Sequence, residues 1–122
     1  MAAVSIAFEA PDNVRGNSPS RARPIDLVHL ANQTMGDKAL EMEVLQMFAR
    51  QARNCLQEIS RLEGDGMLAA VHRLKGAASA VGAFQVSTAA ERLEETPGDA
   101  ALLASVGVAV LEAENFILKL CR

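Results

Sequence analysis

His72, Lys75 and Gly76 stand close together in a segment whose apolar spacing predicts a helix. At 100° per residue, a helix over 66–81 places His72 on a face about 140° from the centre of its apolar stripe. The imidazole of His72 is therefore expected to face solvent, where a partner can reach it. The predicted stripe consists of Met67, Val71, Leu74, Ala78 and Val81.

The residue types around His72 suit phosphoryl transfer. In that reaction negative charge spreads over three oxygen atoms, so a protein contributes mainly position and electrostatics. A neutral imidazole can act as the nucleophile. Lys75, one helical turn further on, can offset part of the charge of the transferred group, although an exposed pair of this kind contributes little energy. Gly76 weakens a helix relative to alanine, which suggests that a partner must come close there.

The pattern His-x-Leu-Lys-Gly, followed by small residues and by Val81-Gly82-Ala83-Phe84, resembles the histidine phosphotransfer (HPt) domains of bacterial phosphorelays. The motif runs from about 68 to 95, and the order of predicted helices extends the resemblance to 24–122. The resemblance implies that His72 accepts a phosphoryl group from the aspartate of a receiver domain, or from a sensor histidine kinase. The group would then pass to another receiver domain.

The same resemblance implies a docking surface for the receiver domain around His72. Lys75 would be the charge partner of the phosphate, and Gly76 would permit close approach. Any Mg²⁺ would belong to the receiver domain, so the chain is expected to need no cofactor or metal of its own. The remaining residues of the expected docking surface are Leu68, Arg73 and Ser79.

A second side chain should hold the inner nitrogen of the imidazole, because an acceptor for its N–H fixes the tautomer and the ring orientation. Glu94 follows the apolar Leu93 as His72 follows the apolar Val71, so antiparallel packing of their helices can bring the two side chains together. The resemblance, particularly to the phosphotransfer domains of chemotaxis kinases, also implies Glu94. Glu94 is therefore the expected partner, and the less favoured alternatives are Glu91 and Gln85.

The composition indicates one small all-α domain. The chain has 122 residues, half of them hydrophobic, and its only aromatic residues are four phenylalanines, which favours a helical core. We expect an antiparallel four-helix bundle with an additional short N-terminal helix. Residues 1–23 are expected to be a disordered N-terminal tail, because the stretch before 24 is rich in proline and polar residues. The bundle domain would occupy 24–122.

Apolar spacing and turn residues place the individual helices. Pro24 is expected at the first position of the short helix, and Asp37 is expected to cap the next one. Gly64-Asp65-Gly66 should form a tight turn before the helix that carries His72. The expected helices cover about 25–35, 37–63, 66–81, 84–95 and the segment that follows a turn at 96–99.

Several other classes of protein are disfavoured. The formal net charge is −3, of which residues 1–23 contribute +1 and the remainder −4, and no basic stripe is present for nucleic acid. The longest apolar run, 100–111, is too short to predict a membrane span, and no signal peptide is evident, so a cytoplasmic location is expected. Cys55 and Cys121 are expected to be free thiols.

The sequence shows neither metal-ligand spacing nor a nucleotide-binding loop. The chain is therefore expected to be a monomeric phosphoryl carrier, and not an enzyme that charges itself from ATP. His29 lacks lysine and glycine neighbours and is expected to be a solvated or hydrogen-bonded surface residue. Two alternatives stay open: a non-catalytic helical module that binds a partner through an apolar groove, and a phosphotransfer domain detached from a larger kinase.

Overall fold

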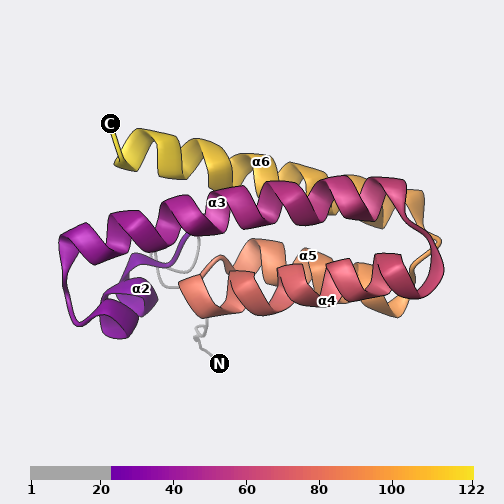
Figure 1. The fold of residues 1–122 in the computed structure, drawn as a ribbon, viewed down its shortest axis with the longest axis horizontal. Helices are drawn as coiled ribbons and strands as arrows, with labels where there is room; N and C mark the ends of the chain where they lie inside the picture. The colour runs from indigo at the N-terminus through magenta and orange to yellow at the C-terminus, as the bar shows by residue number, and fades with distance from the viewer. Residues whose placement is uncertain (1–22) are drawn as a thin grey trace, which may run out of the picture.

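The computed structural model describes residues 23–122, and across this range the chain forms five α-helices and no strand (Figure 1). The predicted all-α class is confirmed. The tail predicted for residues 1–23 lies outside the described residues, except for Arg23. The helices are α2 (Leu27–Thr34), α3 (Lys38–Arg61), α4 (Gly64–Val81), α5 (Phe84–Glu95) and α6 (Ala100–Leu120).

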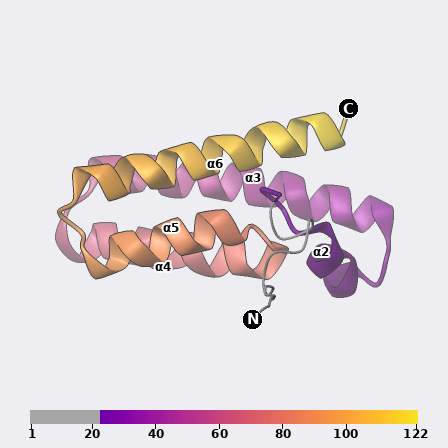
Figure 2. The same ribbon diagram turned by 180° about the vertical axis from the view of Figure 1, so that it is seen from behind.

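The four longer helices run alternately up and down and form the predicted antiparallel bundle (Figures 1 and 2). Helix α3 packs against α4 and α6, and α5 packs against the same two helices. Helices α4 and α6 therefore occupy opposite corners of the bundle. The short α2 lies at the end of the bundle where α3 begins, and it contacts α3 and α4.

The core follows the apolar spacing of the sequence. In α4 the predicted stripe is buried from Val71 to Val81, whereas Met67, at its start, is only half-buried. Cys55 lies in the core with 1% of its surface exposed, and Cys121 is half-buried. Both thiols are free, as expected. Burial in apolar surroundings raises the pKa of the Cys55 thiol, so this cysteine acts as a small core residue.

Side-chain caps begin three of the helices. Asp37 accepts a hydrogen bond from the backbone N–H of Leu40 at 3.1 Å, as predicted. Asp26 in turn caps α2, with its carboxylate accepting from the N–H groups of Val28 and His29. The prediction that Pro24 is the first residue of this helix was wrong, because the cap at Asp26 begins the helix later.

The segment before α2 is tied to the turn between α4 and α5. The N–H of Asp26 donates to the carbonyl of Gly82 at 2.8 Å, and Ile25 is completely buried. Gly82 ends α4 with a φ of 86°, a left-handed conformation that favours glycine. A Cβ at this position would lie 2.9 Å from the carbonyl oxygen of Asp26. The close approach therefore depends on glycine.

The predicted turn at Gly64-Asp65-Gly66 was wrong, because these residues form the first turn of α4. Gly64 has a φ of 60°, which turns the chain at the start of the helix. Asp65 places a carboxylate in the first helical turn, where the helix dipole favours negative charge. The connection from α3 to α4 therefore consists of Leu62 and Glu63 alone.

Helix α6 is unusually apolar. Within residues 23–122 it is the one helix that is long and hydrophobic enough to cross a membrane by length and composition, with a mean hydropathy of 1.7 over its best window. A core helix of a bundle meets the same criterion. One side of α6 packs on α3 and α5 and buries Val106, Val110, Ala113 and Ile117.

Candidate functional site

Helix α4 presents His72 to solvent from the middle of its length. Val71 and Leu74 are fully buried against the bundle and fix the rotation of the helix. The side chain of His72, between them in sequence, is 71% exposed. The predicted orientation of the imidazole is therefore present in the structure.

Helix α5 brings a carboxylate to this imidazole. Leu93 is fully buried, and the next residue, Glu94, reaches across to α4, where its Oε2 lies 2.9 Å from Nδ1 of His72. Because a carboxylate accepts hydrogen bonds, Nδ1 carries the proton and donates. This bond leaves Nε2 as the nitrogen with a free lone pair. Among residues 23–122, no hydrogen-bond partner is found for Nε2, and the side chain that carries it is largely exposed.

Lys75 contacts the same carboxylate. Its Nζ donates to Oε1 of Glu94 at 3.1 Å, so Glu94 holds the imidazole with one oxygen and the ammonium group with the other. The hydrogen bonds from His72 and Lys75 lower the pKa of Glu94, and the bond to Glu94 raises the pKa of Lys75. Glu94 is therefore a stable carboxylate at neutral pH, and Lys75 stays protonated.

The bond between Lys75 and Glu94 is not among the contacts predicted from the sequence. Lys75 was expected to lean toward a phosphoryl group on His72, whereas in the structure the ammonium group is already paired. The reason is geometric, since the position that lets Glu94 reach Nδ1 of His72 also lies within reach of a side chain one turn further along α4. A phosphoryl group at His72 would have to share this cation with Glu94.

The residues predicted to dock a partner surround His72 on the outer face of α4. Arg73 and Ser79 are exposed, and Leu68 is half-buried. Arg73 is held by an ion pair with Glu58 of α3, which raises the pKa of the arginine. Glu58 is not among the residues predicted from the sequence, and its only sequence signal is its position one residue before the buried Ile59.

Gly76 lies in the interior of α4 on the same exposed face. A Cβ at this position would meet no atom within 4 Å, apart from its own helical backbone and immediate neighbours. The packing of the bundle therefore does not require glycine here. The exposed face of α4 is open at Gly76.

The other candidates of the sequence analysis lie elsewhere. Glu91 is exposed and does not reach His72, and Gln85 lines a groove between α5 and α6. His29 is half-buried, with its Nε2 3.2 Å from the carbonyl oxygen of Ala80 and its ring edge-on to Phe84 at 5.2 Å. His29 is thus hydrogen-bonded, which is one of the two outcomes expected for it.

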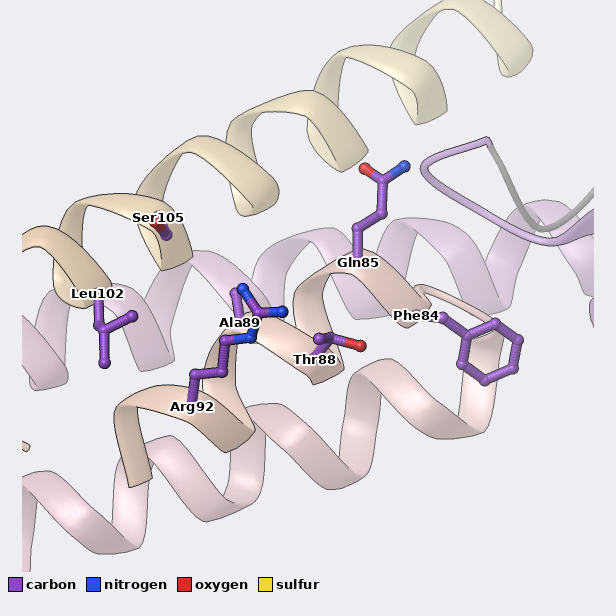
Figure 3. A pocket seen from close by; sticks show the side chains of 7 residues that line it. All are labelled: Phe84, Gln85, Thr88, Ala89, Arg92, Leu102 and Ser105. Carbon is purple, nitrogen blue, oxygen red and sulfur yellow. The ribbon is translucent and has the colours of Figure 1, made fainter. Parts of the chain in front are cut away.

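Two of the grooves on the described part of the chain contain no residue of the site. The groove between α5 and α6 has a volume of about 390 Å³, and Figure 3 shows Gln85, Thr88 and Arg92 along it. The other lies between α3 and α6, has a volume of about 580 Å³ and includes Arg50 and Arg53. Within residues 23–122 no group of three or more His, Cys, Asp or Glu side chains is placed to hold a metal ion.

Comparison with known proteins identifies the family. No curated protein and no solved structure matches the chain. The family model described as the Hpt domain matches residues 43–116, which is more than half of the chain and includes His72, Lys75, Gly76 and Glu94. An exposed histidine held by a carboxylate on a four-helix bundle accords with this match, and the chain belongs to the Hpt domain family.

Proposed function

We propose that this chain is a phosphoryl carrier of a two-component phosphorelay that is phosphorylated on Nε2 of His72. Membership of the Hpt family implies a phosphotransfer module. The observation that supports the assignment to His72 is the bond between its Nδ1 and Glu94, which engages the inner nitrogen and leaves Nε2 accessible on an exposed face.

In the proposed reaction the lone pair of Nε2 attacks the phosphorus of a phosphoaspartate on a receiver domain. The N–P bond forms as the P–O bond to the aspartate breaks, and the aspartate leaves as a carboxylate. The proton on Nδ1 stays in place, so the phosphorylated ring gains positive charge. Glu94 stabilises this charge through the hydrogen bond that already exists at 2.9 Å. The reverse sequence returns the group to a second receiver domain.

The neighbours of His72 have distinct parts in this proposal. Lys75 offsets charge on the phosphoryl oxygens, and Gly76 keeps the surface low where the receiver domain docks. Leu68, Arg73 and Ser79 form the rest of the docking surface. The Mg²⁺ that receiver chemistry uses would belong to the partner, and the chain would carry neither a cofactor nor a nucleotide. A cytoplasmic location, where kinases and receiver domains are found together, is part of the same proposal.

The test is transfer from a phosphorylated receiver domain. The purified chain is incubated with a panel of receiver domains that carry radiolabelled phosphoaspartate, and the label on the chain is followed over time. We expect an acid-labile, base-stable label that is lost in His72→Gln. His29→Gln is the matched control, because it removes the other histidine of the sequence, and it should label as the unaltered chain does.

The outcome that contradicts the proposal is label that persists in His72→Gln. A chain that binds receiver domains tightly, without label and regardless of His72, would instead support the non-catalytic interaction module.

The role of Glu94 needs a separate variant. Glu94→Gln keeps the shape of the side chain but removes the negative charge that stabilises the phosphorylated ring, so we expect slower labelling with unchanged receiver binding. Glu91→Gln, on the same helix but without contact to His72, is the matched control. Equal labelling rates for the two variants would show that Glu94 does not act on His72.

A further inference from the structure

Helix α6 carries a second apolar stripe, on the face that points away from the bundle. Its inner face supplies buried residues such as Val106 and Val110 to the core. Its outer face presents Val108, Leu111 and Leu118, which are 55%, 51% and 63% exposed. Only 28% of the most apolar window of α6 is buried. A helix that is hydrophobic on opposite sides normally has partners on both, and residues 23–122 supply only one.

The outer stripe has the spacing of a coiled-coil seam. Ala104, Val108, Leu111, Asn115 and Leu118 follow one another at intervals of four, three, four and three residues, and all five are exposed. In heptad notation Val108 and Asn115 occupy a positions, and Leu111 and Leu118 occupy d positions. β-Branched residues at a with leucine at d favour two parallel helices, and a single asparagine at a fixes their register.

We infer that a second copy of this chain covers the seam, with the two α6 helices packed in parallel about a two-fold axis. In that arrangement Asn115 of each copy lies opposite Asn115 of the other, where the two amides can hydrogen-bond. The apolar residues on either side, Leu111 and Leu118, pack against their own counterparts. A seam that is complementary to itself in this way needs no other partner.

The charges beside the seam also fit a second copy. Glu114 occupies a g position and Lys119 the following e position, and these positions face each other across a parallel pair of helices. Arg53 of α3 donates to Glu114 through Nε at 3.1 Å and so fixes the carboxylate at the edge of the seam. Lys119 is exposed and makes no ion pair among residues 23–122. The two-fold axis would produce the contact between Glu114 and Lys119 twice.

A membrane surface fits this face less well. Helices that lie on membranes are rich in lysine and arginine on their polar side. On α6 itself the charged residues that flank the outer stripe are Glu112, Glu114 and Lys119. Beside Leu118, α3 adds Arg50 and Arg53, but Arg53 is paired with Glu114, and residues 24–122 carry a net charge of −4. Receiver docking is also a poor explanation, because α4, the helix that carries His72, lies at the opposite corner of the bundle (Figures 1 and 2). A dimer through α6 leaves His72 accessible.

The seam is short. From Ala104 to Leu118 it extends about 21 Å along the helix, so the contact is small compared with specific stable interfaces, which begin at roughly 1,200 Å². The dimer is therefore a weak one that forms as concentration rises. This inference changes the expectation of a monomer from the sequence, and it does not depend on the proposed phosphotransfer.

The first test is sedimentation equilibrium of the full chain over concentrations from about 10 µM to about 1 mM, a range suited to a small interface. The mass should rise from 13.0 kDa toward twice that value. Leu111→Glu should abolish the rise, and Met47→Glu, an equally exposed apolar residue on α3 (59% exposed), should leave it unchanged. A mass that stays at 13.0 kDa throughout overturns the inference. So does a Leu111→Glu variant that loses only binding to lipid vesicles, since the occupant would then be a membrane.

The second test addresses the parallel register. In a Cys121→Ser background, Ala104→Cys should form a disulfide-linked dimer under mild oxidation, because a parallel pair places the two copies of residue 104 together. An antiparallel pair would separate them along the whole seam. Ala39→Cys, exposed on α3, should cross-link far more slowly. Equal cross-linking of the two variants would overturn the parallel arrangement.

Discussion

Replacement of Gly76 by alanine should make the protein more stable and a slower phosphoryl carrier. The added Cβ would meet no atom within 4 Å beyond its own helical backbone, so no clash opposes the change. Alanine is favoured over glycine in a helix interior by about 0.8–1 kcal/mol. Gly76→Ala should therefore raise the free energy of unfolding by about 0.5–1 kcal/mol. For a domain of this size that is an increase in Tm of several degrees.

Phosphoryl transfer should change in the opposite direction. The new methyl group lies on the outer face of α4, one turn after His72, where a receiver domain is proposed to dock. A displacement of about 1 Å at a reacting centre can cost on the order of a hundredfold in rate. We therefore expect Gly76→Ala to reduce the rate constant for transfer from a phosphorylated receiver domain by about tenfold to a hundredfold.

The matched control is Gly107→Ala in α6. A Cβ at Gly107 also meets no atom within 4 Å, so the stability gain should be similar, while α6 lies at the corner of the bundle opposite His72. Urea unfolding followed by helical circular dichroism measures stability, and single-turnover labelling measures transfer. Equal transfer rates in the two variants would refute the reasoning that close approach explains Gly76. A loss of stability in Gly76→Ala would show that the position is not open.

Three further predictions concern the fold and the electrostatics of the site. Gly82→Ala should lower the free energy of unfolding by about 2–4 kcal/mol in urea titrations, because a left-handed φ costs about 1–2 kcal/mol without glycine and the Cβ would lie 2.9 Å from the carbonyl oxygen of Asp26. The control is Gly36→Ala, whose Cβ meets nothing within 4 Å and which should therefore lose only the conformational part of this free energy. Equal losses in the two variants would contradict the close approach at Gly82. Leu74→Ala, at a fully buried position, should cost about 2–5 kcal/mol, and a loss below 1 kcal/mol would mean that the core refills the space. Because the folded-state pKa of Glu94 is lowered from 4.5, its carboxylate stabilises the fold above that pH, and this contribution is lost as the pH falls through the lower folded-state pKa. The difference in unfolding free energy between the unaltered chain and Glu94→Gln, measured by urea unfolding at pH 7 and then below pH 4.5, should therefore shrink in acid. A difference that grows in acid would contradict the assignment.

The architecture was predictable because the residues that a helix buries recur every three or four positions along the sequence. The stripe from Val71 to Val81 became the core face of α4, and this orientation made the exposure of His72 predictable. The approach of Glu94 was predictable for a related reason. Each of the two residues follows a buried anchor on neighbouring antiparallel helices, so a rule about packing located a contact between residues 22 positions apart.

Predictions from the sequence were missing or wrong where the contact depended on the direction of a flexible side chain, or where a helix boundary depended on local capping. Lys75 can point in many directions, and only the position of Glu94 across the helix interface selects one. The pairing of Arg73 with Glu58 has the same origin. At the start of α2, both Pro24 as a first helical residue and Asp26 as a cap are compatible with the sequence. The carboxylate of Asp26 accepts hydrogen bonds from the first N–H groups of the helix, so the helix begins after Asp26.

The carboxylate of Glu94 shared between His72 and Lys75 has a consequence for how long a phosphoryl group would stay. Before it arrives, the charge of the Glu94 carboxylate is offset by the ammonium group of Lys75. In the proposed reaction the phosphoryl group would add about two negative charges and the ring would gain one positive charge, beside a carboxylate whose cation is already engaged. The phosphorylated site would therefore carry a net negative charge. Such surroundings would favour transfer to the next partner over long-term storage of the phosphoryl group.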